Sequence, residues 1–222
     1  MRTRASALPQ KSTLADQPTM SEDREAILSR VRGALAPLHT RAPLPNYDAE
    51  MAVLRTLIAG RDLVELFAER IRKVGGLALT DPTALVAHLR AGGRFRGYCD
   101  PVLWPRVAGH FGSEFTVERD FDRTRVDDYA FGITRAAGAI AESGTIILND
   151  ATTSRRLGAL APWVHVAVVE RAGIFSDLPQ AVAALGDDRN VIWCTGPSKT
   201  ADVEGILIEG VHGPGEQIAL VL

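Results

Sequence analysis

Cysteine is scarce in this sequence: among 222 residues only Cys99 and Cys194 occur. They form no Cys-x-x-Cys pair, and no histidine accompanies either one at the spacing of a zinc ligand. The chain alone therefore cannot supply a structural zinc site or the four thiolates of an iron–sulfur cluster, and we expect neither a metal nor a cofactor. Two unpaired thiols are typical of a reducing compartment, which favours a cytoplasmic protein.

An excess of charge and a long apolar run are also missing. The formal net charge is −2, so the chain has no broad positive field for phosphates, and we expect no nucleic acid partner. The longest apolar run, Trp163 to Val169, has seven residues including His165, whereas a helix that spans a bilayer needs about 20. Residues 1–19 lack the apolar stretch of a secretory signal. We therefore expect no membrane insertion.

Two nucleotide-binding motifs are absent as well. The turn at residues 195–200 is not a Walker A loop, because the pattern Gly-x-x-x-x-Gly-Lys-Ser/Thr does not occur. Gly213-Pro214-Gly215 lacks the spacing of the dinucleotide fingerprint. No nicotinamide or flavin site is expected.

What the sequence does have is an ordinary globular composition, 46% hydrophobic and 23% charged. A chain of this length can hold one α/β domain with an appendage or two small domains, and we favour one main core. We interpret residues 1–19 as a disordered tail, residues 20–46 as a helical arm with a proline-rich linker, and residues 47–222 as the α/β domain. In the arm, Ser21 can cap a helix, and translation can start at Met1 or Met20.

Helix signals dominate the first half of the domain. Asp62 and Glu65 have the spacing of a capping box, and the apolar stripe that follows stops at Gly75-Gly76. A short apolar run at residues 77–79 predicts a strand, and Asp81-Pro82 then starts a second helix.

Short apolar runs punctuated by Gly, Pro and Asn replace this pattern from Ile133 onward. Their length and β-branched content predict strands at residues 136–141, 145–148, 164–169, 191–195, 206–208 and 218–222. Between them, Ser176 or Asp177 can cap a helix with Leu178, Val182 and Leu185 on its inner face. Strands that are apolar throughout favour a mostly parallel open sheet with helices on both faces.

One candidate site is the turn Thr195-Gly196-Pro197-Ser198-Lys199-Thr200, which follows a buried strand at the edge where α/β sheets gather ligands. Gly196 allows close backbone approach, and Lys199 adds a positive charge. Thr195, Ser198 and Thr200 offer hydroxyls, so the turn could bind a small anion at a helix N-terminus. The alternative is a capped helix start with an exposed lysine.

A second candidate is the turn Ala141-Glu142-Ser143-Gly144-Thr145, and we expect the two turns to form one small-anion site together. Ser143-Gly144 can form a two-residue hairpin turn, with Thr145 starting the next strand. Glu142 ends an apolar run, where partial burial could raise its pKa for proton transfer or make it a catalytic nucleophile. A simple hairpin is the alternative.

Other side chains are weaker candidates. Arg155 and Arg156 predict the first turn of a short helix with guanidinium groups available for a carboxylate, although such pairs are often only solvated. His212 lies in the glycine-rich loop 210–215, where it could bind an anion, serve acid/base chemistry or be structural. His165 is better explained as a core histidine.

Several of these segments occur in the same order in a known family, which the chain resembles. They are Gly132–Thr134, Ile140–Thr145, Arg156-Leu157 with Leu160–Pro162, Val164–Val169, Thr195–Glu204 and Gly210–Pro214. The family is lactate utilization protein C, also called the LUD domain. The likeness is close over roughly the last 90 residues and loose over residues 40–125, and residues 1–19 have no counterpart. Ser143 stands where the family often has Thr, which keeps the hydroxyl.

This resemblance implies a bacterial cytoplasmic protein of L-lactate utilization. It implies that the protein acts beside an iron–sulfur subunit and a cysteine-rich-domain subunit, and that together they oxidise lactate to pyruvate. It also implies a fold similar to ribose-5-phosphate isomerase, glucosamine-6-phosphate deaminase and the CoA-transferases. A role for Glu142 like that in the CoA-transferases is an analogy from the fold alone.

Three functions remain open at this point. The first, which we favour, is a non-redox subunit of a lactate-oxidising system that binds a small carboxylate or another anion. The second is a stand-alone isomerase or acyl/CoA-transferase-like enzyme with Glu142 as base or nucleophile. The third is an interaction scaffold for an iron–sulfur partner, docking through an N-terminal helical stripe formed by Ile27, Val31 and Leu35.

Overall fold

The computed structural model describes residues 20–38, 48–153, 156–186, 188, 190–201 and 205–222. The chain divides into two compact units, Met1–Asp48 and Ala49–Leu222. In the first unit, helix α1 (Met20–Leu35) begins one residue before the predicted Ser21 cap. Its predicted stripe is exposed: Ile27 by 56%, Val31 by 47% and Leu35 by 37%. The predicted tail and the proline-rich linker lie outside the described residues.

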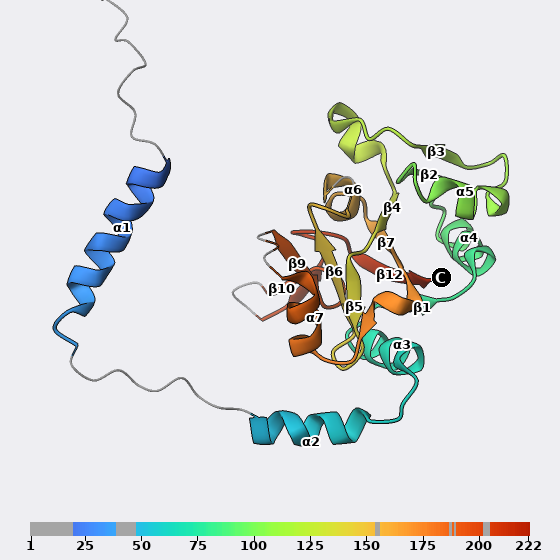
Figure 1. The fold of residues 1–222 in the computed structure, drawn as a ribbon. Coiled ribbons are helices and arrows are strands. Elements are labelled where there is room, and N and C mark those ends of the chain that lie inside the picture. Colours follow the sequence, from blue (N-terminus) through green and yellow to red (C-terminus); the bar gives the residue numbers. More distant parts are fainter. Residues whose placement is uncertain (1–19, 39–47, 154–155, 187, 189, 202–204) are drawn as a thin grey trace, which may run out of the picture. The chain divides into compact units, whose positions relative to one another are not determined.

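The second unit is built on a parallel sheet of six strands (Figure 1). Their order is β1 (Leu77–Leu79), β12 (Glu216–Val221), β7 (Val164–Val169), β4 (Phe131–Arg135), β2 (Arg96–Cys99) and β3 (Thr116–Glu118). Every neighbouring pair in this sheet is parallel. All six residues of β7 are buried, because both faces of the sheet are covered. The predicted α/β class with a mostly parallel sheet is confirmed.

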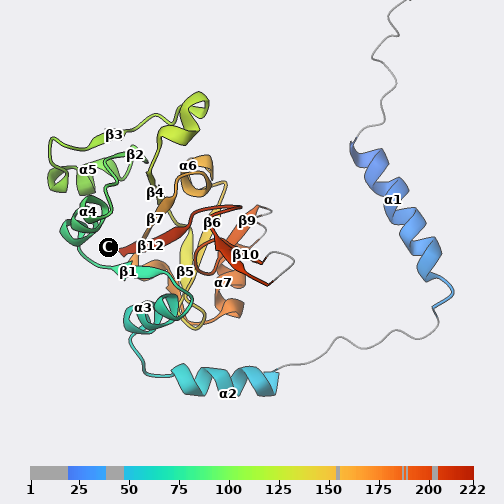
Figure 2. The same cartoon turned by 180° about the vertical axis from the view of Figure 1, so that it is seen from behind.

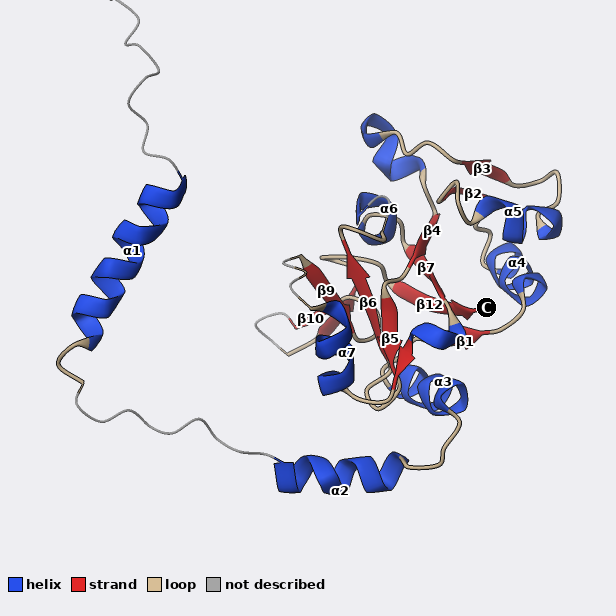
Figure 3. Cartoon of the chain, in the orientation of Figure 1, coloured by secondary structure: helices blue, strands red, loops and turns tan. Residues whose placement is uncertain are grey.

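Different layers cover the two faces of the parallel sheet (Figures 2 and 3). On one face, helices α4 (Pro82–Ala91) and α5 (Trp104–Val107) form a core with residues such as Ile133 and Val166. On the other, α3 (Leu63–Lys73), α6 (Arg156–Leu160) and a second sheet pack over Ala167 and Ala219. Short 3-10 helices complete this unit at η1 (Ala108–His110), η2 (Arg123–Asp128) and η3 (Arg171–Gly173).

The second sheet is a mixed sheet of four strands. Their order is β8 (Ile174–Phe175), β5 (Gly138–Ile140), β6 (Thr145–Asn149) and β9 (Val191–Cys194). Strands β5 and β8 are parallel, whereas β6 runs antiparallel to both of its neighbours. Helix α7 (Leu178–Leu185) packs on this sheet through Ala181, which contacts Ile140 and Ile147.

The predicted inner face of α7 was wrong for Leu178 and Val182 and right for Leu185. Leu178 is 48% exposed and Val182 is 52% exposed, while Ala181 is fully buried and Leu185 packs beside it. Because the helix is short and apolar on nearly every side, its periodicity defines no single inner face.

The segment after β9 also differs from the prediction. No helix starts at Thr195–Thr200 among the described residues; Lys199–Ala201 instead forms strand β10, which pairs antiparallel with β11 (Leu207–Glu209). The predicted helix start at this turn is therefore wrong, so no aligned helical N–H groups are available there. The predicted binding of an anion by this turn stays a prediction.

The predicted helix starts elsewhere are confirmed by their hydrogen bonds. Asp62 accepts from the backbone N of Glu65 at 2.9 Å, and Asp81 accepts from Thr83 N at 2.8 Å. Of the two candidates before α7, Asp177 is the cap and accepts from Gln180 N at 2.9 Å. These local contacts satisfy N–H groups that have no partner within the helix.

Candidate functional site

The two predicted turns meet in the structure. Antiparallel pairing of β6 with β9 places Ile146 opposite Cys194, so that Thr145 and Thr195 lie side by side. Thr145 Oγ1 is 2.8 Å from Thr195 Oγ1 and 2.7 Å from Ser143 Oγ. A chain of three hydroxyl groups therefore links one turn to the other.

Helix α3 and the residue that ends it, Val74, pack against the backbone of both turns. Gly144 has φ +69°, and a Cβ there would lie 2.4 Å from the backbone N of Ile71. Gly196 has φ +83°, and a Cβ there would lie 2.3 Å from the carbonyl O of Val74. Because both close approaches require glycine, α3 fixes the distance between the turns.

The turn between β5 and β6 is longer than predicted. Ile140 pairs with Thr145, which leaves a four-residue connection instead of the two-residue turn Ser143-Gly144. Gly144 N donates to the carbonyl O of Ile140 at 3.0 Å, which closes an α-turn through the left-handed glycine. Glu142 and Ser143 consequently lie at the tip of the connection.

Glu142 is held by the start of helix α7. Its Oε1 accepts a hydrogen bond from Leu178 N at 2.9 Å, and its own backbone N donates to the carbonyl O of Ser176 at 3.2 Å. The positive end of the helix dipole favours a carboxylate at this position. The side chain is thus oriented and half-buried, and its predicted catalytic role stays a prediction.

Two cavities lie against the tip of this turn. One has a volume of about 340 Å³ and is lined by Ile140, Glu142, Ser143, Thr145, Leu178 and Trp193. The other has a volume of about 380 Å³ and is lined by Leu57, Ile58, Arg70, Glu142 and Ser143. We call them the tryptophan cavity and the arginine cavity. They share Glu142 and Ser143.

Arg70 is the residue that sequence reasoning missed. It lies on α3 and is half-buried, and its side-chain Nε is buried without a hydrogen-bond partner among the described residues. Such a guanidinium group can bind a carboxylate through parallel N–H···O bonds. No local signal separates Arg70 from Arg72 on the same helix, so only the packing of α3 against the turn could identify it.

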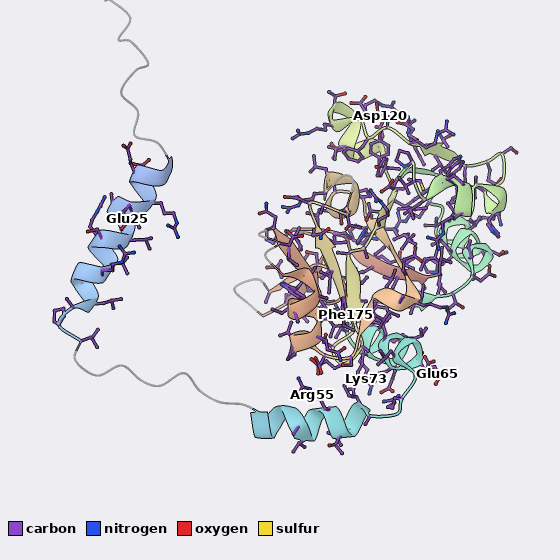
Figure 4. All side chains as sticks on the ribbon, viewed as in Figure 1. Glu25, Arg55, Glu65, Lys73, Asp120 and Phe175 are labelled. Carbon is purple, nitrogen blue, oxygen red and sulfur yellow. The ribbon has the colours of Figure 1, made fainter. Side chains whose placement is uncertain are left out.

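Helix α2 (Asp48–Ile58) forms one wall of the arginine cavity through Leu57 and Ile58. Arg55 of this helix points toward the domain, and its Nε donates to Asp177 Oδ2 at 3.2 Å (Figure 4). Burial alone would raise the pKa of Asp177, but the hydrogen bond from Gln180 N and the Arg55 guanidinium bring it below its ordinary value. The same helix N-terminus, at α7, therefore anchors both α2 and Glu142.

The predicted cationic ligands are already engaged. Lys199 Nζ lies 3.1 Å from Glu209 Oε1, across the β10–β11 hairpin. Arg156 Nε lies 2.6 Å from Asp150 Oδ1, and its Nη2 donates to Asn190 O at 3.1 Å. Arg155 lies outside the described residues. Neither Lys199 nor Arg156 lines the two cavities.

The C-terminal part of the turn at residues 195–200 is hydrogen-bonded to the glycine-rich loop at residues 210–215. The backbone N of Ser198 donates to the carbonyl O of Pro214 at 2.8 Å, and its Oγ accepts from His212 N at 3.3 Å. The loop is therefore attached through its backbone, while the His212 side chain is exposed. Thr200 belongs to β10 and pairs with Ile208. Of the predicted turn, Thr195 is the residue that contacts Thr145 directly.

The remaining titratable candidates are structural. His165 is buried and its Nε2 lies 3.0 Å from Thr134 Oγ1; burial lowers its pKa to about 4. Burial raises the pKa of Cys99 to about 12 and that of Cys194 to about 11, so neither thiol forms a thiolate at neutral pH. The described residues include no cluster of metal-binding side chains. They also include no helix with the length and apolar character to cross a membrane.

The family model of the LUD domain matches residues 105–222, more than half of the chain. The chain belongs to the LUD domain family. This LUD domain contains both turns and the loop with His212, whereas Arg70 and α2 precede the matched region.

Named relatives of this LUD domain protein include two called lactate utilization protein C. The one from Deinococcus radiodurans is 29% identical over 206 residues, covering 89% of this chain and 94% of that protein. The one from Bacillus licheniformis is 30% identical over 127 residues, and this alignment spans 53% of that protein. A crystal structure of a DUF162 family protein from Deinococcus radiodurans is 26% identical, with a TM-score of 0.53, and covers 72% of this chain and 95% of that one.

Proposed function

We propose that this LUD domain protein takes part in lactate utilization as a non-redox component that binds a small carboxylate, L-lactate or pyruvate, in the arginine cavity. The names of its relatives support the lactate role. The observation that carries the binding role is the guanidinium group of Arg70, which lines the cavity and whose buried Nε has no hydrogen-bond partner among the described residues.

The arrangement of the arginine cavity suits a 2-hydroxy acid. Arg70 would bind the carboxylate, since charge-assisted bonds of this kind are the strong ones. The free oxygen of Glu142 would accept a bond from the 2-hydroxyl group. Leu57 and Ile58 would contact the methyl group. Each part of the small ligand thus has a side chain of matching chemistry.

We assign the oxidation itself to partner subunits. Converting lactate to pyruvate releases electrons that need an acceptor, and the resemblance to the lactate utilization family supplies one in an iron–sulfur subunit. We propose a cytoplasmic location, in keeping with the two unpaired thiols. In this arrangement the LUD domain presents or captures the organic acid.

Calorimetric titration of the purified chain with L-lactate and with pyruvate tests the proposal. Arg70→Gln should weaken binding by about 10- to 100-fold, because a hydrogen-bonded charge contributes about 1.5–3 kcal/mol. Arg72→Gln is the matched control, since it removes the same charge from the exposed side of α3 and should leave the affinity unchanged. The proposal fails if the wild-type chain binds neither acid, or if both variants bind equally well.

A second candidate function is a stand-alone isomerase or acyl/CoA-transferase-like enzyme. It is favoured by the position of Glu142, whose oriented carboxylate lines both cavities. Glu142→Gln keeps an oxygen for Leu178 N and should preserve folding while removing the acid/base or nucleophilic group. Turnover of a sugar phosphate or an acyl-CoA by the purified chain, abolished in this variant, would establish this function.

A further inference from the structure

The two cavities at the Glu142–Ser143 tip offer more space than lactate needs. Each has the volume of a pocket for a larger organic ligand, since such pockets span about 300–1,000 Å³. A three-carbon acid held by Arg70 would leave the tryptophan cavity empty. Because Glu142 and Ser143 line both cavities, a longer ligand could reach from one to the other across this turn.

The lining of the tryptophan cavity shows which chemical group would fit there. Trp193 is 40% exposed and Leu178 is 48% exposed, whereas Ile140 is buried beneath them. Large apolar side chains exposed beside a hollow lose contact with water when an apolar group fills it. Ligand side chains that are aliphatic or aromatic match this surface.

The charged side chains around the two cavities further restrict which ligands fit. Among the described residues that line the tryptophan cavity, Glu142 is the charged one, and none is a cation. A second carboxylate or a phosphate would therefore be placed beside a carboxylate without a compensating group, which is unfavourable. The cation lies in the arginine cavity, so a ligand that spans both would have one anionic end and one neutral apolar end.

We propose that the site takes 2-hydroxy or 2-oxo acids with a large apolar side chain. Their carboxylate binds Arg70. A 2-hydroxyl group donates to Glu142, a 2-oxo group accepts from the hydroxyl group of Ser143, and the side chain packs on Trp193 and Leu178. This inference rests on the proposed function, because it uses Arg70 as the carboxylate anchor. Lactate, which carries only a methyl group, is then a weaker ligand that leaves the tryptophan cavity empty.

The experiment compares L-lactate, 2-hydroxy-4-methylpentanoate and 3-phenyllactate by calorimetry on the full chain. Affinity should rise along this series, and 3-phenyllactate should bind at least about tenfold more tightly than lactate, as expected for added apolar groups in a fitting pocket. Trp193→Ala should abolish this preference and leave lactate binding unchanged. Val182→Ala, on an exposed position of α7 outside the cavity, is the matched control and should keep the preference.

Leu178→Ala provides a second variant in case Trp193→Ala does not fold, and it should reduce the same preference. Equal affinities for all three acids would overturn this inference, and so would a preference for the larger acids that survives both Trp193→Ala and Leu178→Ala. In either case, measurable binding of lactate would still support the proposed function. If the wild-type protein binds none of the three acids, both the proposed function and this inference are wrong.

Discussion

The parallel sheet and the mixed sheet differ in what their residues contact. In the parallel sheet, β7 and β4 are buried, and their apolar side chains belong to the hydrophobic cores on the two faces. In the mixed sheet, β5 and β6 are also buried, but the edge strand β9 exposes Trp193, and the turn between β5 and β6 lines two cavities. The difference suggests that stability is concentrated in one sheet and ligand chemistry at the edge of the other.

The largest effect should come from the parallel sheet. Ile133 is fully buried, so Ile133→Ala removes apolar contacts and leaves a cavity; the free energy of unfolding should fall by about 2–5 kcal/mol. Val182→Ala, on the exposed side of α7, should change it by less than about 0.5 kcal/mol. Urea unfolding measures both. Similar losses in the two variants would contradict the role of buried contacts in the parallel sheet.

Acid should weaken the parallel sheet through His165. The pKa of this histidine is about 4 in the folded protein, against an ordinary value of 6.5. In the unfolded chain, His165 therefore becomes protonated below pH 6.5. In the folded chain it becomes protonated only below about pH 4. Across this window the free energy of unfolding should fall by about 1.4 kcal/mol for each pH unit lost.

His165→Gln isolates that contribution, because glutamine can still reach Thr134 but does not titrate. The unfolding free energies of wild type and variant, measured from pH 7 to pH 4, should differ in slope by the amount given above. Parallel curves would mean that the imidazole does not control the acid response.

A third test concerns the contact between the mixed sheet and α3. Gly144 and Gly93 both have positive φ, at +69° and +67°, but a Cβ at Gly93 would meet no atom within 4 Å. Both alanine variants should share the cost of a left-handed residue, and Gly144→Ala should lose about 1–3 kcal/mol more because its methyl group meets the backbone of Ile71. Equal unfolding free energies would show that α3 does not constrain the turn.

The smallest effect should come from the β10–β11 hairpin. The pair Lys199–Glu209 is exposed on both sides, so a double-mutant cycle with Lys199→Met and Glu209→Gln should give a coupling of about 0.2–1 kcal/mol. Lactate binding should not change in Lys199→Met. A large loss of affinity for lactate in Lys199→Met would show that Lys199 takes part in binding, and it would weaken the assignment of Arg70 as the carboxylate ligand.

Local signals in the sequence predicted much of this fold. The strands Leu77–Leu79 and Val164–Val169 have the predicted limits, and the caps at Asp62 and Asp81 form as expected. These features depend on a few neighbouring residues, so a pattern of apolar and capping residues is sufficient. The contact between the two turns was also predicted. Each turn lies at the end of an apolar run, and these runs were predicted to be strands of the same domain.

Features that depend on distant contacts were not predictable in the same way. Ser198 and Thr200 are typical of a helix start, yet pairing with Leu207–Glu209 makes their segment a strand. The packing of α3 against the turns places Arg70 in a cavity, although nothing near it in the sequence marks it. The two turns therefore meet as expected, whereas the predicted binding role of their side chains, Lys199 included, stays a prediction.

The order of strands has a consequence for how the domain is made. Strand β12 lies between β1 and β7, and β1 pairs through Leu77–Leu79 with Ile218–Leu220. During synthesis β1 leaves the ribosome long before this partner exists, and contacts so distant along the chain form slowly. The apolar edge of the nascent sheet is thus open to chaperones or to misassembly until β12 emerges and inserts.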